Sequence, residues 1–152
     1  MDAELLVLAG KVLLGLAISA ALWFGVRPLI AGGSGWGSFA QPFGVADLPE
    51  GERFSSVSGA IGQGMLSANY RSMWTLVVNT AGFGLSIRSV FGEAPSIFVP
   101  WSHVESVVET RIPFIRAAVV RIRGQSHAIS LYGPPGLAVA RAYARLHAAR
   151  TL

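Results

Sequence analysis

Ser102, His103 and Glu105 bring a hydroxyl, an imidazole and a carboxylate close together in the sequence, and nucleophilic hydrolysis requires these groups. The apolar residues around them predict a strand, and neighbouring residues of a strand point to opposite faces. We therefore expect that Ser102 and His103 do not form a nucleophile–base pair. The G-x-S-x-G turn that exposes the nucleophile of many hydrolases is absent from the sequence. The sequence thus assigns no catalytic residue and predicts that the protein is not an enzyme.

The residue types also argue against a metal or a cofactor. The three histidines, His103, His127 and His147, do not occur in the H-x-x-x-H or H-E-x-x-H spacings of zinc-binding helices. The chain has no cysteine, which excludes disulfides, cysteine-ligated zinc and a thiol nucleophile. The glycine-rich run at 32–37 does not match a dinucleotide fingerprint, and no Lys-Ser or Lys-Thr follows it. We expect no metal and no cofactor.

Four arginines late in the chain, Arg111, Arg116, Arg121 and Arg123, form its best electrostatic feature. Arg121 and Arg123 have the same parity along a predicted strand and share a face, whereas Arg116 has the opposite parity. Two guanidinium groups on one face could bind a phosphate or an acidic peptide, and the alternative is an ordinary solvated face. From Arg27 onward the chain has eleven arginines and six acidic residues, an excess of five positive charges. The interleaved series of aromatic residues that is typical of nucleic-acid binding is absent, so we expect no nucleic acid.

Pro100 and Trp101 form the most conspicuous apolar pair. Trp101 could stack on a ligand. A tryptophan at the end of a strand more often belongs to the core and satisfies its ring N–H at the edge, and this is the interpretation that we favour.

The first 27 residues predict a membrane anchor. Residues 5–26 are apolar except for Lys11, and at about 1.5 Å per residue they form roughly 33 Å of helix, enough to cross a bilayer core of about 30 Å. Trp23 and Phe24, followed by Arg27, are typical of the interfacial end of a span. The alternatives are a cleaved signal peptide, with a cleavage site near Ser19, and a buried core helix.

The charges that flank the span favour one orientation. Asp2 and Glu4 precede it and Arg27 follows it, and cationic flanks stay on the cytoplasmic side. We therefore expect a single-pass protein of a bacterial inner membrane with its N-terminus outside and its head in the cytoplasm. A periplasmic head is the alternative, because Lys11 opposes this bias.

Residues 28–51 are rich in Gly, Pro and Ser and predict a linker that becomes ordered near Trp36 and Phe39. The remaining residues, 52–152, predict the globular domain. Turn signals every 8–15 residues there are typical of an all-β fold. The expected strands are Arg53–Ile61, Ser72–Asn79, Phe83–Ser89, Ser96–Trp101, His103–Glu109, Ile115–Arg123 and His127–Leu131.

The chain then changes period. Gly133-Pro134-Pro135 ends the last strand, and residues 136–150 predict an amphipathic helix. Val139, Ala140, Tyr143 and Leu146 form its apolar stripe. The predicted fold is mainly β with helices: a bent sheet or barrel of about six or seven antiparallel strands, capped by one C-terminal helix.

This order of elements resembles the pleckstrin-homology (PH) superfold, including bacterial PH-like and GRAM-like domains. The most specific match is Thr75–Val108, where the strand LVVN, a turn, GFGLSI, a short insert and SIFVPWSHVESV follow one another. The pattern is also similar to that of small membrane-anchored bacterial proteins. Phosphoinositide-binding PH domains cluster cations in the loop between their first two strands. Here Phe54–Tyr70 contains none, so the resemblance implies a binding or scaffold module and not an inositide reader.

The sequence therefore predicts a non-catalytic interaction module, held at the membrane, that binds a protein partner through a strand edge or a helix–sheet groove. The alternative is peripheral binding of anionic lipid headgroups through an arginine-rich face, with Arg121 and Arg123 as its ligand-binding residues. An enzyme of a class without a recognisable motif is the third possibility.

Overall fold

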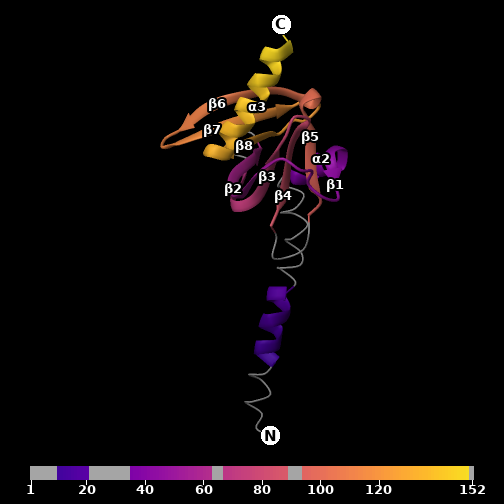
Figure 1. Ribbon diagram of the computed structural model, residues 1–152. Coiled ribbons are helices and arrows are strands. Elements are labelled where there is room, and N and C mark those ends of the chain that lie inside the picture. Colours follow the sequence, from indigo (N-terminus) through magenta and orange to yellow (C-terminus); the bar gives the residue numbers. More distant parts are fainter. Residues whose placement is uncertain (1–9, 21–34, 63–66, 89–93, 151–152) are drawn as a thin grey trace. The chain divides into compact units, whose positions relative to one another are not determined.

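The computed structural model describes residues 10–20, 35–62, 67–88 and 94–150 (Figure 1). The chain divides into two compact units, Met1–Gly33 and Ser34–Leu152. All the strands belong to the second unit.

In the first unit, residues 10–20 are helical and exposed. The expected span at 5–26 lies in large part outside the described residues. Among the described residues, no helix is both long enough and apolar enough to cross a membrane. The anchor, its orientation and the signal-peptide alternative therefore stay predictions.

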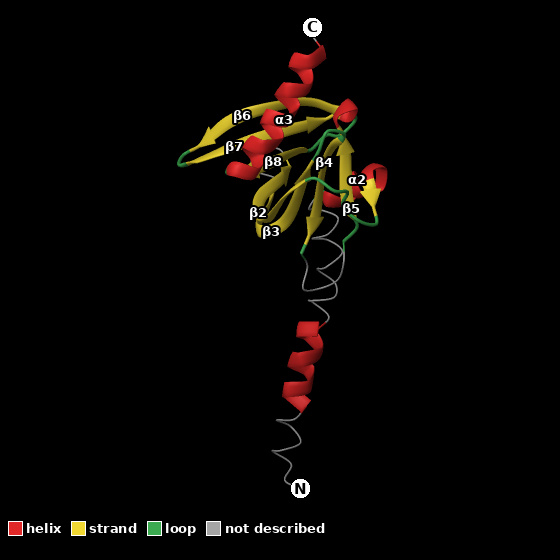
Figure 2. Ribbon diagram, viewed as in Figure 1, coloured by secondary structure: helices red, strands yellow, loops and turns green. Residues whose placement is uncertain are grey.

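The second unit is mainly β, as expected, and its strands form one open antiparallel sheet (Figure 2). The order across this sheet is β1-β5-β4-β3-β2-β8-β7-β6. The strands are β1 (Gly44–Val45), β2 (Glu52–Gly62), β3 (Ala68–Val78), β4 (Gly82–Ile87), β5 (Ser96–Pro100), β6 (Val104–Ile112), β7 (Ile115–Ile122) and β8 (Ala128–Tyr132). Of the two expected arrangements, the structure adopts the open sheet, because β1 and β6 are separate edges.

Strand β2 joins two meanders, β2–β5 and β6–β8. It pairs with β3 along most of its length but with β8 only from Gly59 to Gly62. Its register with β3 shifts twice between Phe54 and Gly59, and Ser56 has a positive φ of 56°. Such bulges bend a strand and increase its twist, which lets one strand belong to two differently directed parts of the sheet. Gly59 stands where they meet, and a Cβ there would collide with the Ser130 carbonyl and the Trp74 ring.

Helix α2 (Trp36–Phe43) covers part of the first meander and contacts β5 and β1. Its Trp36, Phe39 and Phe43 are buried in the core. The linker expected at 28–51 was predicted to become ordered near Trp36 and Phe39, and α2 and β1 lie there, in the folded unit that starts at Ser34. Three aromatic side chains buried on one face outweigh the weak helix propensity of the Gly- and Pro-containing sequence.

Helix α3 (Pro134–Arg150) packs against β7, β6, β8 and β3. The predicted apolar stripe is confirmed, since Val139 and Ala140 are buried and Tyr143 and Leu146 pack against the core. A Cβ at Gly136 would collide with the carbonyl oxygen of Leu131, so glycine lets the helix approach the sheet closely here. The predicted C-terminal capping helix is thus present.

Three predicted strand boundaries need correction. Strand β3 begins at Ala68, four residues before the expected start at Ser72. Trp101–His103 is a 3₁₀ turn between β5 and β6, not the junction of two strands. Strand β6 continues through Ile112, beyond the expected end at Glu109, and a two-residue turn connects it to β7.

Candidate functional site

The structure contradicts the prediction that Ser102 and His103 cannot meet. The Ser102 hydroxyl lies 3.2 Å from Nδ1 of His103, because both residues belong to the 3₁₀ turn and not to a strand. The alternation of a strand therefore does not apply to them. The His103 ring also packs edge-on against Phe43, with 5.5 Å between ring centroids.

The same Ser–His geometry recurs at Ser126 and His127, where the hydroxyl and Nδ1 are again 3.2 Å apart. Both pairs are exposed, and no hydrogen bond among the described residues brings a carboxylate to either imidazole. A hydrolytic centre needs a base that a third group orients. Among the described residues there is also no group of three or more side chains placed to hold a metal ion. These pairs are local surface contacts and do not form a catalytic arrangement.

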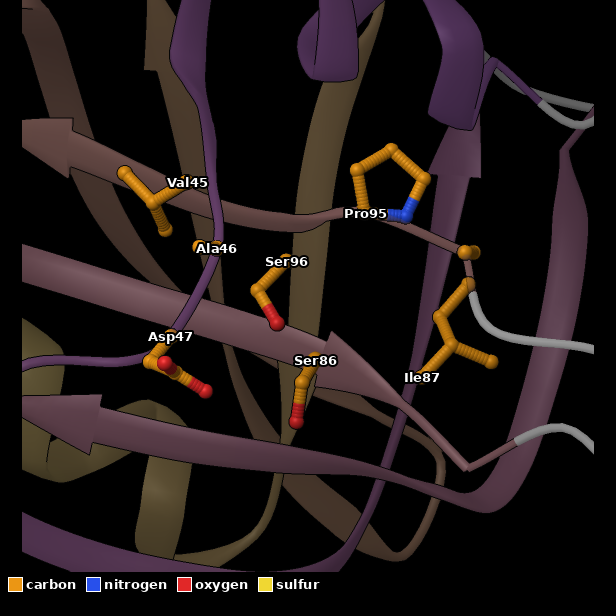
Figure 3. A pocket seen from close by; sticks show the side chains of 8 residues that line it. Val45, Ala46, Asp47, Ser86, Ile87, Pro95 and Ser96 are labelled. Carbon is orange, nitrogen blue, oxygen red and sulfur yellow. The ribbon is translucent and has the colours of Figure 1, made fainter.

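An open hollow of about 490 Å³ lies beside β4 and β5 (Figure 3). Its polar groups are the Asp47 carboxylate and the hydroxyls of Ser86 and Ser96, and its apolar wall includes Val45 and Ile87. One exposed carboxylate and two hydroxyls offer neither a paired acid and base nor a buried charge, the features that mark an active site.

Trp101 belongs to the core, as predicted. It is buried, and its indole N–H donates a hydrogen bond of 3.0 Å to the backbone oxygen of Asn79. The Asn79 side chain organises the turn from β3 to β4 by accepting hydrogen bonds from the N–H groups of Ala81 and Gly82. Trp101 therefore locks this turn and presents no ring face for a ligand.

Arg121 lies on β7 opposite Ser106, and Arg123 lies just beyond the end of the strand. Both are exposed, and among the described residues neither takes part in an ion pair. The Arg123 backbone N–H donates to the His103 carbonyl, which fixes the start of the hairpin β6–β7. The two arginines are thus available to an anionic group but do not enclose a site.

The two edges of the sheet are protected very differently. Strand β1 has only two residues and lies beside α2, whereas β6 has nine residues and, among the described strands, pairs only with β7. The hydroxyl of Tyr143 on α3 donates to the Glu105 carbonyl and so covers the start of β6. From Val108 to Ile112 the side chains are exposed. A long unpaired edge exposes backbone N–H and C=O groups that can pair with another chain.

The edge hairpin carries charges of both signs. Arg116 forms an ion pair with Glu109 at 2.8 Å, and both side chains are largely exposed, so the pair contributes little to stability. Arg111 lies directly opposite Arg116. With Arg121, Arg123 and Glu105, the hairpin and its flank carry four arginines and two glutamates, a net positive surface.

The chain matches no protein-family model and no curated protein.

The turn between β6 and β7 is an exposed feature that the sequence analysis missed. Phe114 is 97% exposed, and Ile112 and Ile115 on either side of the turn are also exposed. The sequence signal was the segment Arg-Ile-Pro-Phe-Ile-Arg at 111–116, an apolar stretch bracketed by cations. It was overlooked because β6 was expected to end at Glu109, which left these residues in an unassigned loop.

Proposed function

We propose that the unit Ser34–Leu152 is a PH-like, non-catalytic interaction module of a membrane-anchored protein, and that it binds an extended segment of a protein partner along the edge of β6. The observation that carries this proposal is the contrast between the two sheet edges, with β6 long and exposed and β1 short. Adding a strand to an exposed edge is a recurrent mode of peptide recognition.

The order of elements supports the PH-like part of the proposal. Seven consecutive strands, β2–β8, precede a single C-terminal helix, which agrees with the element order on which the resemblance rests. The membrane part depends on the apolar segment at 5–26 and on its flanking charges. With the head in the cytoplasm, the partner is a cytoplasmic protein or the cytoplasmic part of a membrane protein.

Charge indicates the kind of segment that would fit. Arg111 and Arg116 lie near the end of β6 at the hairpin turn, and Arg121 and Arg123 lie near its start. The cations therefore lie toward both ends of the edge, with Glu105 and Glu109 of β6 between them, and an extended peptide with acidic residues near its ends is the complementary partner. Arg121 and Arg123 become contacts for its carboxylates, or for a phosphate on it.

Strand geometry identifies a substitution that blocks the edge without breaking the hairpin. The turn Pro113-Phe114 closes on the pair Ile112 and Ile115, and hydrogen-bonding pairs alternate from there. Glu109 therefore directs its backbone N–H away from β7. A proline at this position removes an outward donor and keeps the ladder to β7.

The test compares Glu109→Pro with Glu109→Ala in the full chain in its native membrane. Both variants lose the ion pair with Arg116, but only proline removes the backbone donor. A photo-crosslinking residue at exposed Thr110 reports the neighbour of the edge, and the same residue at exposed Thr80, in the β3–β4 turn, is the control position.

In the Glu109→Ala protein, we expect the crosslinker at Thr110, and not the one at Thr80, to give a discrete product. In the Glu109→Pro protein, the amount of this product should fall by about tenfold, because the partner loses one hydrogen bond and can no longer approach the edge closely. Equal product from the two variants would contradict edge pairing. So would a product at Thr110 no stronger than at Thr80.

A further inference from the structure

The hairpin β6–β7 has an apolar tip that no described part of the protein covers. Among the described residues of the sheet unit, five large apolar side chains are strongly exposed, and four of them belong to this hairpin: Phe114 at 97%, Val108 at 55%, Ile115 at 51% and Ile112 at 42%. In Figure 1 the closed end of the hairpin projects past the neighbouring strands. The exposure is therefore concentrated at one projecting point.

The register sorts the hairpin into two faces. Ile112 lies opposite Ile115 and Val108 lies opposite Val119, so these side chains share one face, with Phe114 at the turn. Arg111 lies opposite Arg116 on the other face. The hairpin end is thus amphipathic, with two cations one residue behind the apolar pair.

We propose that this tip, with Phe114 at its point, inserts into the interfacial region of an anionic lipid bilayer while Arg111 and Arg116 bind lipid phosphates. Amphipathic elements with cationic polar faces bury their apolar side about 5–10 Å into the headgroup boundary. At about 3.3 Å per residue along a strand, Arg111 and Arg116 lie one residue farther from the tip than the pair Ile112 and Ile115. When the tip is inserted, the two guanidinium groups are therefore at the level of the lipid phosphates. This inference is independent of the pairing proposed for the edge of β6.

A bilayer fits the tip better than a protein surface does. The apolar residues form a narrow point and not a broad face, and a two-residue turn closed by Pro113 presents them without a loop that must first be ordered. The net positive charge from Arg27 onward complements an anionic leaflet. The apolar segment at 5–26 is expected to hold the domain at a membrane surface, so the tip does not have to reach the bilayer by free diffusion.

The arginines contribute unequally. Arg116 shares its charge with Glu109 through the ion pair at 2.8 Å, whereas Arg111 has no ion pair among the described residues. Arg111→Gln is therefore expected to weaken lipid binding more than Arg116→Gln does. Each cation near an anionic surface contributes about a fivefold change in affinity.

The experiment uses the natural absence of cysteine. A single cysteine replaces Phe114, or exposed Thr80 as the control, and carries an environment-sensitive fluorophore in the full chain. The chain is reconstituted in vesicles of neutral lipid or of neutral lipid with about one third anionic lipid, with spin-labelled quenchers at the headgroup boundary.

We expect a blue shift and quenching of the probe at position 114 in anionic vesicles, a loss of both in 0.5 M salt, and no change at position 80. In a second pair of variants that carries the probe at position 112, Phe114→Ser should reduce the quenching of this probe by about tenfold, while Arg53→Gln, on β2, should not. A probe at 114 that behaves like the one at 80 would overturn the proposal and leave the tip as a protein contact. Equal insertion into neutral vesicles would overturn the role of the arginines.

Discussion

At the scale of single residues, two buried tryptophans differ in what their ring N–H groups meet. Trp101 donates its N–H to the Asn79 carbonyl at 3.0 Å. Trp74 is 1% exposed, and its Nε1 has no hydrogen-bond partner among the described residues. A buried N–H without a partner costs about 1–3 kcal/mol, whereas a satisfied one stabilises the fold by about 1 kcal/mol. Trp74 persists because its ring packs against Trp36 and Tyr70.

This difference between the two indole N–H groups predicts that replacing each tryptophan by phenylalanine changes the free energy of unfolding by a different amount. Trp74→Phe and Trp101→Phe both remove part of an indole and leave a similar small cavity. Only Trp101→Phe loses a hydrogen bond, and only Trp74→Phe removes an unpaired donor. We expect Trp101→Phe to lower the free energy of unfolding by at least about 1 kcal/mol more than Trp74→Phe does. Urea titrations of the full chain in mild detergent measure both, and an equal or larger loss for Trp74→Phe would contradict the argument.

At this scale, a residue's environment was predicted correctly where burial determines it, and wrongly where it depends on the residue at which a strand ends. The core position of Trp101 followed from its size and its place at the end of a strand. The separation of Ser102 from His103 was wrong because strand β5 ends at Pro100, and one turn of 3₁₀ helix changes which side chains meet. The hydropathy of the segment cannot locate such a turn, since the same residues fit either conformation.

At the scale of elements, two helical glycines have different surroundings. A Cβ at Gly136 in α3 would collide with the Leu131 carbonyl oxygen and lie 3.2 Å from the backbone nitrogen of Ala118. A Cβ at Gly37 in α2 would have nothing within 4 Å. Alanine favours helix over glycine at both sites, so the surroundings alone distinguish the two.

We therefore expect Gly136→Ala to lower the free energy of unfolding by about 1–3 kcal/mol, because α3 must move away from β7 and β8. Gly37→Ala should change it by zero to about 1 kcal/mol in the stabilising direction. Thermal unfolding followed by circular dichroism distinguishes them. A Gly136→Ala protein as stable as Gly37→Ala would show that the helix approaches the sheet less closely than the structure indicates.

Element prediction followed the hydrophobic period. Alternation along the sequence located β4 and β7, although both strands are buried on both faces over part of their length, and a helical period located the apolar stripe of α3. Helix α2 was missed because Gly35, Gly37 and Pro42 give its sequence the composition of a linker, and only the contacts of Trp36, Phe39 and Phe43 with distant strands stabilise it. The first part of β3 was missed because its residues are mostly exposed.

At the scale of the whole molecule, seven of the eight strands were predictable, with β1 missed, but their order across the sheet was not. The pairing of β2 with β8 joins residues about seventy positions apart, Ala60 with Ser130, and depends on bulges that sequence periodicity does not reveal. That pairing decides which strand becomes the free edge. The open edge at β6, and with it the candidate site, therefore emerges only from the complete topology.

The side of the membrane on which this edge lies decides which partners and lipids it can meet. Asp2 and Glu4 before the apolar segment and Arg27 after it predict a cytoplasmic domain. Ser126 is suited to test this, since it is exposed in the turn between β7 and β8 and the chain has no cysteine of its own. A single cysteine there can be labelled from one side only.

We expect Ser126→Cys to resist a membrane-impermeant maleimide in intact cells and to react fully after lysis, because the bilayer separates reagent from domain. A cysteine replacing Ala3, before the apolar segment, should show the reverse once the outer membrane is permeabilised, and it controls for reagent access. Labelling of Ser126→Cys after outer-membrane permeabilisation alone would place the domain in the periplasm. In that case Lys11, and not Arg27, sets the orientation, and partners should be sought in the cell envelope.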